Sequence, residues 1–240
     1  MKDFFNNSVT GDLRVNEQPV LGALHNVFHR EHDRIAQSLQ GINPQWNDET
    51  LFQEARRILN AQWQHIIYNE WLPIIIGGPQ MENYGLQPLT TGYSDGYNEN
   101  IDSRVTNEFA AAAFRFGHNL IPSIMKRVPA QPPLCSRASF SLRDVFNNAD
   151  IVRSQNWIDE IIKGETVVAS ESLDNNFVSD VREHLFEGTT MALDLVAVNT
   201  QRGRDHGLPG YIHYRRTCGL GQVKTFEDLE SNIPKSVRFF

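Results

Sequence analysis

The sequence predicts a mainly α-helical fold. In the N-terminal half, apolar residues recur at steps of three and four, which is typical of helices that bury one face. No alternating pattern of five residues predicts a strand, and the chain has neither internal repeats nor low-complexity tracts. With 240 residues, 40% of them hydrophobic, the chain can bury a core and fits one domain or a large piece of one.

Two long helices are predicted first. The apolar spacing predicts one over Pro19–Gln40, where the proline suits the first turn. A second is predicted from about Asp48 to Trp71, capped by Asn47 or Asp48 and stopped by Pro73. Its aromatic residues Trp63, Tyr68 and Trp71 sit at helical spacing and are expected in the core.

The remaining chain alternates loops with shorter helices. The segment 77–100 is rich in Gly, Asn, Tyr and Pro, which predicts a loop. A third helix is expected over about Ser103–Met125, around an alanine-rich centre. Shorter helices are expected near 142–147, 155–163, 179–186, 190–199 and 207–217.

Charge and hydropathy exclude several classes of protein. A formal net charge of -7 and a pI near 5.6 argue against general affinity for nucleic acid or anionic membranes, because both need clustered Lys and Arg. No apolar run is long enough for a membrane span, and the first residues lack the apolar core of a signal peptide. Taken alone, this start predicts a cytosolic chain.

Three sequence motifs carry polar residues: GDLRVNEQP at 11–19, FRFGHNLI at 114–121 and NTQRGRDHGLPGY at 199–211. In their order, approximate spacing and residue pattern they resemble the animal haem peroxidase family, also called the peroxidase–cyclooxygenase family. The wording is nearest to invertebrate members such as peroxinectin, chorion-type peroxidase or peroxidasin. The resemblance covers most of the chain and implies a single multi-helix haem peroxidase domain, here incomplete.

The resemblance assigns the proximal ligand of the haem iron to His118. Such a ligand needs a neutral imidazole whose second nitrogen is held by a hydrogen-bond acceptor. The family supplies that acceptor from the residue matching Asn199. From the residues alone, His118 is equally an ordinary helix histidine bonded to a carbonyl, and Asn199 a helix C-cap.

The resemblance also implies roles for four further residues. Arg14 matches the distal arginine that polarises peroxide, by the electrostatic logic of an oxyanion hole. Glu17 matches the glutamate that esterifies a methyl group of haem b. Arg202 matches an arginine that pairs with a haem propionate, and Arg115 lies on the haem side one turn before the histidine. Alternatively, Arg14 and Glu17 are a solvated pair at a helix start, and the other two are surface arginines.

The resemblance also shows which parts of the family pattern are not matched. The distal histidine and the calcium loop lie upstream of the family segments found here, so we expect residues 1–240 to be a partial domain without the family's calcium site. Gln18 replaces a methionine, so no sulfonium link to haem is expected. Only Cys135 and Cys218 are present, and the family's pairing implies a partner for Cys218 beyond the C-terminus.

The function implied by the resemblance is a haem peroxidase that reduces hydrogen peroxide. The electron donor would be a halide, a pseudohalide or a phenol, and the context an extracellular response to oxidative stress. The family's distal histidine acts as general base and acid, and nothing in the chain clearly replaces it. The alternative is therefore a catalytically impaired haem-binding or cell-adhesion module. The sequence specifies neither the donor nor the oligomeric state.

A zinc site is a further alternative. His25, His29 and His32 fall on one helical face at spacings that could bind zinc. They do not form an H-E-x-x-H motif. The resemblance implies instead that His25 and His32 belong to a structural helix.

Overall fold

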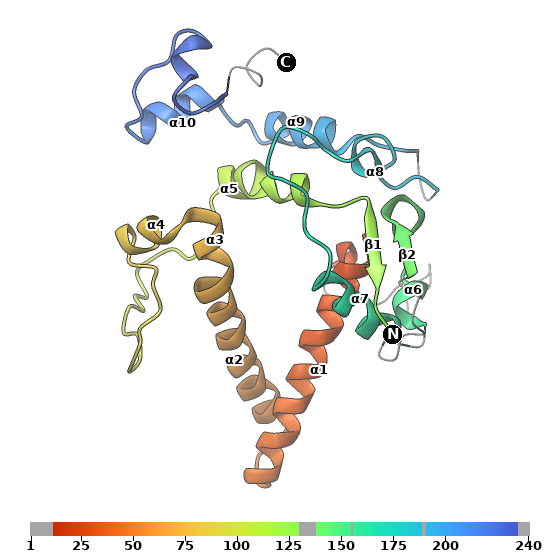
Figure 1. The fold of residues 1–240 in the computed structure, drawn as a ribbon. Helices are drawn as coiled ribbons and strands as arrows, with labels where there is room; N and C mark the ends of the chain where they lie inside the picture. The colour runs from red at the N-terminus through yellow and green to blue at the C-terminus, as the bar shows by residue number, and fades with distance from the viewer. Residues whose placement is uncertain (1–11, 130–137, 155, 189–190, 235–240) are drawn as a thin grey trace. The chain divides into compact units, whose positions relative to one another are not determined.

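The computed structural model describes residues 12–129, 138–154, 156–188 and 191–234. The chain divides into two units, Val20–Ser103 and Met1–Pro19 with Arg104–Phe240, and each is described separately below. Cys135 lies outside the described residues. The mainly helical fold predicted from the sequence is confirmed (Figure 1).

The unit Val20–Ser103 is entirely helices and loops within the described chain. Its elements are α1 (Pro19–Ile42), α2 (Asp48–Ile66), the π-helical turn η2 (Ile67–Trp71), α3 (Leu72–Ile76) and α4 (Gly78–Asn83). Asn47 caps α2 by accepting a hydrogen bond from Thr50 N at 2.8 Å, as predicted. The first two helices thus begin where the sequence indicated.

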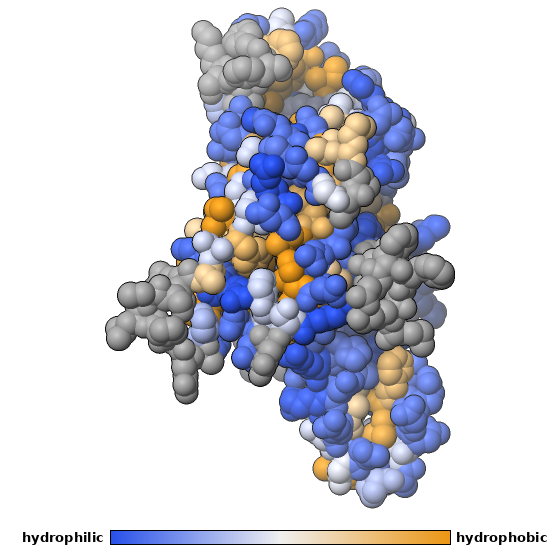
Figure 2. Space-filling view, turned by 90° about the vertical axis from the view of Figure 1, so that its right-hand side faces the viewer, coloured by the Kyte–Doolittle hydropathy of each residue, from blue (hydrophilic) through white to orange (hydrophobic). Residues whose placement is uncertain are grey.

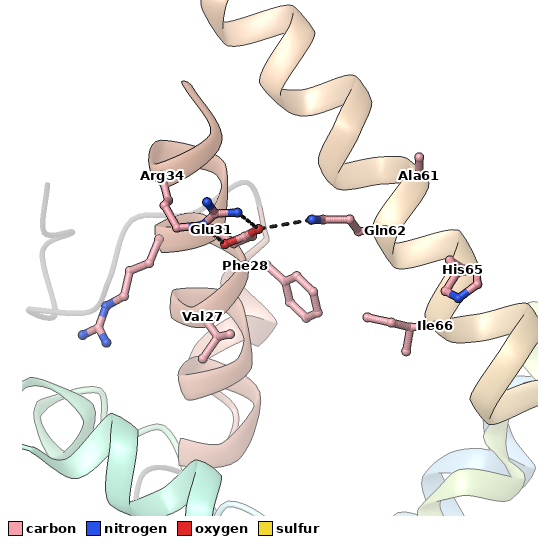
Figure 3. A pocket seen from close by; sticks show the side chains of 9 residues that line it. Val27, Phe28, Glu31, Arg34, Ala61, Gln62, His65 and Ile66 are labelled. Carbon is pink, nitrogen blue, oxygen red and sulfur yellow. Dashed lines mark hydrogen bonds and ion pairs between the residues drawn. The ribbon is translucent and has the colours of Figure 1, made fainter. Parts of the chain in front are cut away.

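Helices α1 and α2 enclose a groove of about 820 Å³ (Figure 3). Phe28 packs edge-on against Trp63, with ring centroids 4.7 Å apart. Glu31 accepts hydrogen bonds from Arg34 at 2.7 Å on its own helix and from Gln62 Nε2 of α2 at 3.2 Å. The contacts between the two helices therefore include an aromatic pair and a shared carboxylate, and His32 of α1 adds a ring contact with Phe52 of α2.

The prediction that Pro73 stops the second helix is wrong. The α-helical ladder of α2 gives way to a π-helical turn at Ile67, and Pro73 lies at the start of α3. A proline is tolerated in a first turn because its missing N–H has no partner there. The helical path ends at Gly77, whose φ of 80° suits a residue without a Cβ.

The prediction of a loop over 77–100 holds only for its second part. Helix α4 occupies the start, and Met81 is buried. Pro79 in the first turn makes this short helix possible. Gly and Pro are loop signals in a sequence, whereas Gly78 and Pro79 here begin a helix.

The second unit combines short helices with one small sheet. Its elements are η1 (Leu13–Asn16), α5 (Asn107–Ala111), η3 (Ala113–Leu120), β1 (Ile124–Arg127), β2 (Ala138–Ser141), η4 (Leu142–Asp144), α6 (Asp150–Arg153), α7 (Trp157–Glu165), α8 (Ser179–Arg182), α9 (Leu195–Asp205), α10 (Tyr211–Thr217) and η5 (Glu227–Leu229). The predicted helices near 155 and 190 begin at positions outside the described residues. Those near 179 and 207 are shorter than predicted.

A third helix over Ser103–Met125 is not formed as predicted. Helix α5 ends at Ala111, and Ala112 leaves the helical region with φ -137° and ψ -67°. A 3-10 segment follows, and the chain then enters β1. The reason is tertiary: buried Asn119 donates to Asn176 O and accepts from Asp174 N at 2.8 Å, which ties this segment to a distant loop.

The sheet was not predicted from the sequence. Strands β1 and β2 pair antiparallel, with Met125 opposite Phe140. Each has only four residues, too few to show an alternating pattern. Helix α7 packs directly on β1: a Cβ placed on buried Gly164 would lie 1.8 Å from Lys126 O. This close approach requires glycine.

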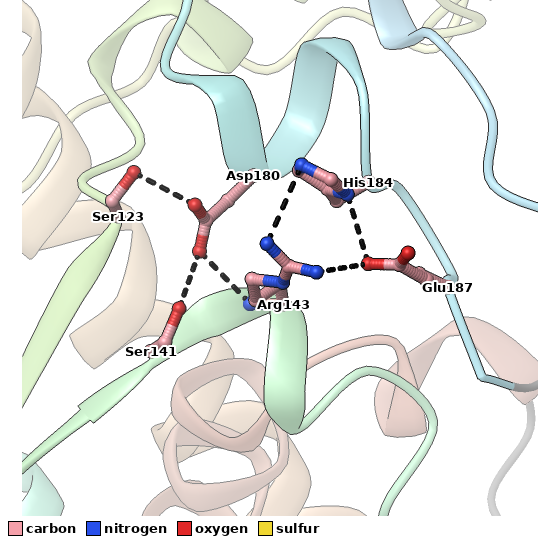
Figure 4. Close-up of polar contacts among 6 residues, drawn as sticks. All are labelled: Ser123, Ser141, Arg143, Asp180, His184 and Glu187. Carbon is pink, nitrogen blue, oxygen red and sulfur yellow. Dashed lines mark hydrogen bonds and ion pairs between the residues drawn. The ribbon is translucent and has the colours of Figure 1, made fainter.

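A buried aspartate joins β2 and η4 to α8 (Figure 4). Asp180 accepts hydrogen bonds from Ser123 Oγ at 3.1 Å, Ser141 Oγ at 2.8 Å and Arg143 N at 2.9 Å. Beside it, the Arg143 side chain donates to Glu187 at 2.7 Å. Because a buried carboxylate is stable only when its oxygens are bonded, this network fixes α8 on the sheet.

Many large apolar side chains remain on the surface, and Figure 2 shows hydrophobic patches among hydrophilic residues on the face it presents. Trp63, Tyr68 and Trp71 are exposed, so the expectation that they lie in the core is wrong. Within the described ranges, no helix combines the length and the hydropathy that a membrane span requires.

The contact between α7 and β1 gives a stability prediction. Replacing Gly164 by Ala forces α7 away from β1 and is expected to lower the free energy of unfolding by about 1–3 kcal/mol. The measurement is chemical denaturation followed by circular dichroism. Gly41→Ala is the control, because a Cβ at Gly41 meets nothing within 4 Å and alanine favours the helix. Equal effects of the two substitutions would contradict the packing described.

Candidate functional site

The predicted iron ligand, His118, lies in η3 of the second unit. It is half-buried, and the neighbouring Asn119 is buried and bonded to the 174–176 segment. The position of the imidazole is therefore fixed by its neighbour in sequence.

Helix α9 brings Asn199 to this histidine. Asp194 caps the helix by accepting hydrogen bonds from Val196 N at 2.8 Å and Ala197 N at 3.2 Å. Asn199 then falls in the interior of α9, so the alternative of a helix C-cap is wrong.

Asn199 lies between two of the predicted site residues. Its Nδ2 is 3.0 Å from Nδ1 of His118, and its Oδ1 accepts a hydrogen bond from Nη1 of Arg115 at 3.2 Å. An amide that accepts from a guanidinium at one end offers its N–H groups at the other. In this arrangement Nδ1 of the neutral imidazole is the acceptor, and its proton resides on Nε2.

The surroundings keep the imidazole neutral. Burial lowers the pKa of His118 below 6.5, the positive charge of Arg115 lowers it further, and the hydrogen bond with Asn199 raises it in part. A metal ligand must be unprotonated at the coordinating nitrogen. The neutral imidazole has one unprotonated nitrogen, which in the described arrangement is Nδ1, facing Asn199. The expected acceptor role of Asn199 toward His118 is therefore not the arrangement described, in which Asn199 donates.

The predicted arginines cluster electrostatically around Arg115. Burial lowers the pKa of Arg115, and the positive charges of Arg202 and Arg14 lower it further. Nε of Arg115 is buried without a hydrogen-bond partner, and the Arg202 side chain forms no hydrogen bond or ion pair to described residues. Such a cluster favours an anionic ligand.

Arg14, in the segment 11–19, is exposed, whereas Arg115 is half-buried. Arg14 belongs to η1, and its side chain is 80% exposed. Its Nε donates to Asp12 at 2.9 Å. The adjacent Glu17 is half-buried: burial raises the pKa of its carboxyl, while the charge of Arg14 lowers it. No contact joins Arg14 or Glu17 to His118 in the described chain.

The residues of this unit fit a haem on three observations. His118 provides a neutral imidazole, the arginines provide positive charge for the two propionate carboxylates of a haem, and Arg115 Nε is a buried donor without a partner.

The pairing of Arg14 with Asp12 was not predicted from the sequence. Its signal was available, because an aspartate two residues before an arginine at a helix start is a common cap.

The three histidines of α1 do not form a metal site. His25 Nδ1 is 2.9 Å from Leu21 O, and His32 Nε2 is 3.2 Å from Phe52 O. Among the described residues, no group of three His, Cys, Asp or Glu side chains could hold a metal ion. These ring nitrogens contact backbone carbonyls instead.

Known proteins similar to this chain are peroxidases. Peroxidasin of Drosophila melanogaster is 41% identical over 228 residues, covering 94% of this chain and 14% of its own length. Myeloperoxidase of Mus musculus is 40% identical over 225 residues, covering 92% of this chain and 30% of its own. The chain is also similar to the solved structure of peroxidase A from Dictyostelium discoideum, with a TM-score of 0.77 and 31% sequence identity. This match covers 95% of this chain and 42% of that one.

The chain thus spans less than a third of the length of these curated relatives. The family model described as animal haem peroxidase matches residues 4–238. Together with the identities above, this match shows that the chain belongs to the animal haem peroxidase family.

Proposed function

We propose that this chain forms the proximal side of a haem peroxidase site that reduces hydrogen peroxide and oxidises a small donor. The observation that carries the proposal is the contact of His118 with Asn199 and of Asn199 with Arg115. The family membership supports haem b as the cofactor. A halide, pseudohalide or phenol donor, an extracellular location and a role in oxidative stress are the finer parts of this proposal, and they rest on the resemblance.

In this proposal His118 would hold the haem iron through Nε2, and Arg202 and Arg115 would pair with the propionates. Haem would supply the two-electron chemistry that peroxide reduction needs. A ligating Nε2 leaves the imidazole proton on Nδ1, which then needs an acceptor. The Asn199 amide meets that need by turning its Oδ1 from Arg115 to His118. Asn199 thus sets which nitrogen carries the proton.

Glu17 and Arg14 are proposed to serve the ester link and the distal side. Glu17 is half-buried, as a residue bonded to a cofactor must be, and burial raises the pKa of its carboxyl. Arg14 would polarise peroxide, and for that its guanidinium has to leave Asp12. That ion pair favours a second candidate function, a haem-binding protein with poor turnover.

Haem binding tests the proposal directly. Titration of the chain with haemin should produce a Soret band, and His118→Ala should weaken binding by at least about tenfold, because the residue that would hold the iron is removed. His29→Ala is the control, since this exposed histidine belongs to α1. A Soret band unchanged by His118→Ala would sink the assignment. Peroxide-dependent dye oxidation by the haem complex then separates a peroxidase from a haem-binding protein.

The pKa of His118 gives a pH dependence in the absence of haem. Because the folded-state pKa lies below the unfolded value of 6.5, stability from this group is complete above pH 6.5 and declines as the pH falls through the folded pKa. Removing the charge in Arg115→Gln should shift the titration midpoint of His118 upward, as measured by proton NMR of the imidazole. Arg34→Gln in α1 should leave it in place. A midpoint that does not move would show that Arg115 exerts no electrostatic effect on His118.

A further inference from the structure

The second unit contains a cavity that His118 does not line. It measures about 590 Å³ and lies among α5, the start of η3, α9 and α10. This volume falls within the range of cavities that hold small ligands. His118, Arg115 and Arg14 do not line it.

The walls of the cavity are held in place by polar contacts outside it. Asn107 in α5 donates from Nδ2 to His206 O at 3.2 Å, and its Oδ1 is 2.6 Å from Nδ1 of His206 at the end of α9. Helix α9 ends at Asp205, Gly207 just after it has φ 64°, and Leu208 N donates to Gly203 O at 3.0 Å. The cavity is therefore preformed.

The lining is apolar apart from a few polar groups. Leu208, Pro209 and the Tyr211 ring contribute apolar surface. The hydroxyl of Tyr214 is inaccessible to solvent and has no hydrogen-bond partner in the described chain. A buried hydroxyl without a partner is uncommon in a native protein and marks a place where a ligand atom can bind.

The charges at the cavity offset one another. Glu108 and Arg204 both line it, and neither side chain forms a hydrogen bond or ion pair to described residues. Burial raises the pKa of Tyr214, and the charge of Glu108 raises it further, so the hydroxyl stays protonated and is a donor. The cavity thus combines a buried hydroxyl donor, a carboxylate and a guanidinium, and the two formal charges offset one another.

We infer that this cavity binds a small neutral phenol. The phenol oxygen accepts from Tyr214 Oη–H and its own hydroxyl donates to the Glu108 carboxylate, while the ring lies against Pro209 and Tyr211. A carboxylate ligand would add an unbalanced negative charge to a cavity in which the charges of Glu108 and Arg204 already offset one another, and an aromatic hydrocarbon would leave Tyr214 without a partner. Binding does not depend on haem; only a role of the phenol as electron donor rests on the proposed peroxidase function.

One lining residue connects the cavity to His118. Asn199 lines the cavity and contacts His118. A ligand beside Asn199 therefore lies next to the amide proposed to set the imidazole tautomer.

Fluorine NMR on the 240-residue chain without haem tests the inference. Three probes are compared, para-fluorophenol, para-fluorotoluene and para-fluorobenzoate, by line broadening and titration. The phenol should bind about tenfold tighter than the toluene, the ratio expected from two added hydrogen bonds. Tyr214→Phe should remove most of that ratio and leave the thermal unfolding midpoint unchanged, because it deletes a hydroxyl without a partner. Tyr84→Phe, an exposed tyrosine of the other unit, should behave as wild type.

A second variant locates the bound probe. Ala113→Leu narrows the cavity and should weaken the phenol and the toluene alike; if it does not fold, Tyr214→Phe still decides. Equal binding of phenol and toluene, tighter binding of benzoate, or an unchanged ratio in Tyr214→Phe would each overturn the inference. Because haem is absent throughout, a chain that binds phenol but fails the Soret test keeps this site and loses the peroxidase proposal.

Discussion

The candidate site depends on one amide. Asn199 joins segments that lie 81 residues apart in the chain, and both ends of its side chain are used, one by His118 and one by Arg115. Without it, the imidazole would lose its only described side-chain partner, and the half-buried guanidinium would lose its described acceptor. The low pKa of His118 follows from the same arrangement, since burial and the nearby arginine both disfavour its protonation.

Directional polar contacts of side chains help the scaffold to position this amide. Asp194 caps α9, Asn119 fixes the end of η3, and Asp180 joins α8 to the sheet. Each is a side chain that bonds to backbone groups or hydroxyls of a segment distant in sequence, or begins the helix that carries the site. Such contacts have defined directions, whereas apolar packing tolerates displacement. They therefore suit a site that requires one orientation of an imidazole.

Several large apolar side chains of the unit Val20–Ser103 remain exposed. Helix α2 and η2 leave Trp63, Tyr68 and Trp71 accessible, and helical spacing alone suggested that they were buried. Spacing identifies the apolar face of a helix but does not supply the surface that covers it. In peroxidase A of Dictyostelium discoideum, the matched region accounts for 42% of the solved chain. Exposed apolar patches of this kind are typical of surfaces that contact further polypeptide.

The sequence by itself determined the helical class, the start and cap of α2, the family and the identity of the candidate haem residues. Local signals were sufficient there, because helix periodicity, a capping asparagine and segment wording are properties of neighbouring residues. Only the tertiary structure decided that the alanine-rich helix breaks at Ala112, that a two-stranded sheet follows, and that Pro73 lies in the first turn of a helix. It also decided that Asn199 contacts Arg115 as well as His118, and that Arg14 pairs with Asp12. The physical reason is that a buried polar group takes whichever partner the fold brings within about 3 Å, and that partner is usually not adjacent in sequence.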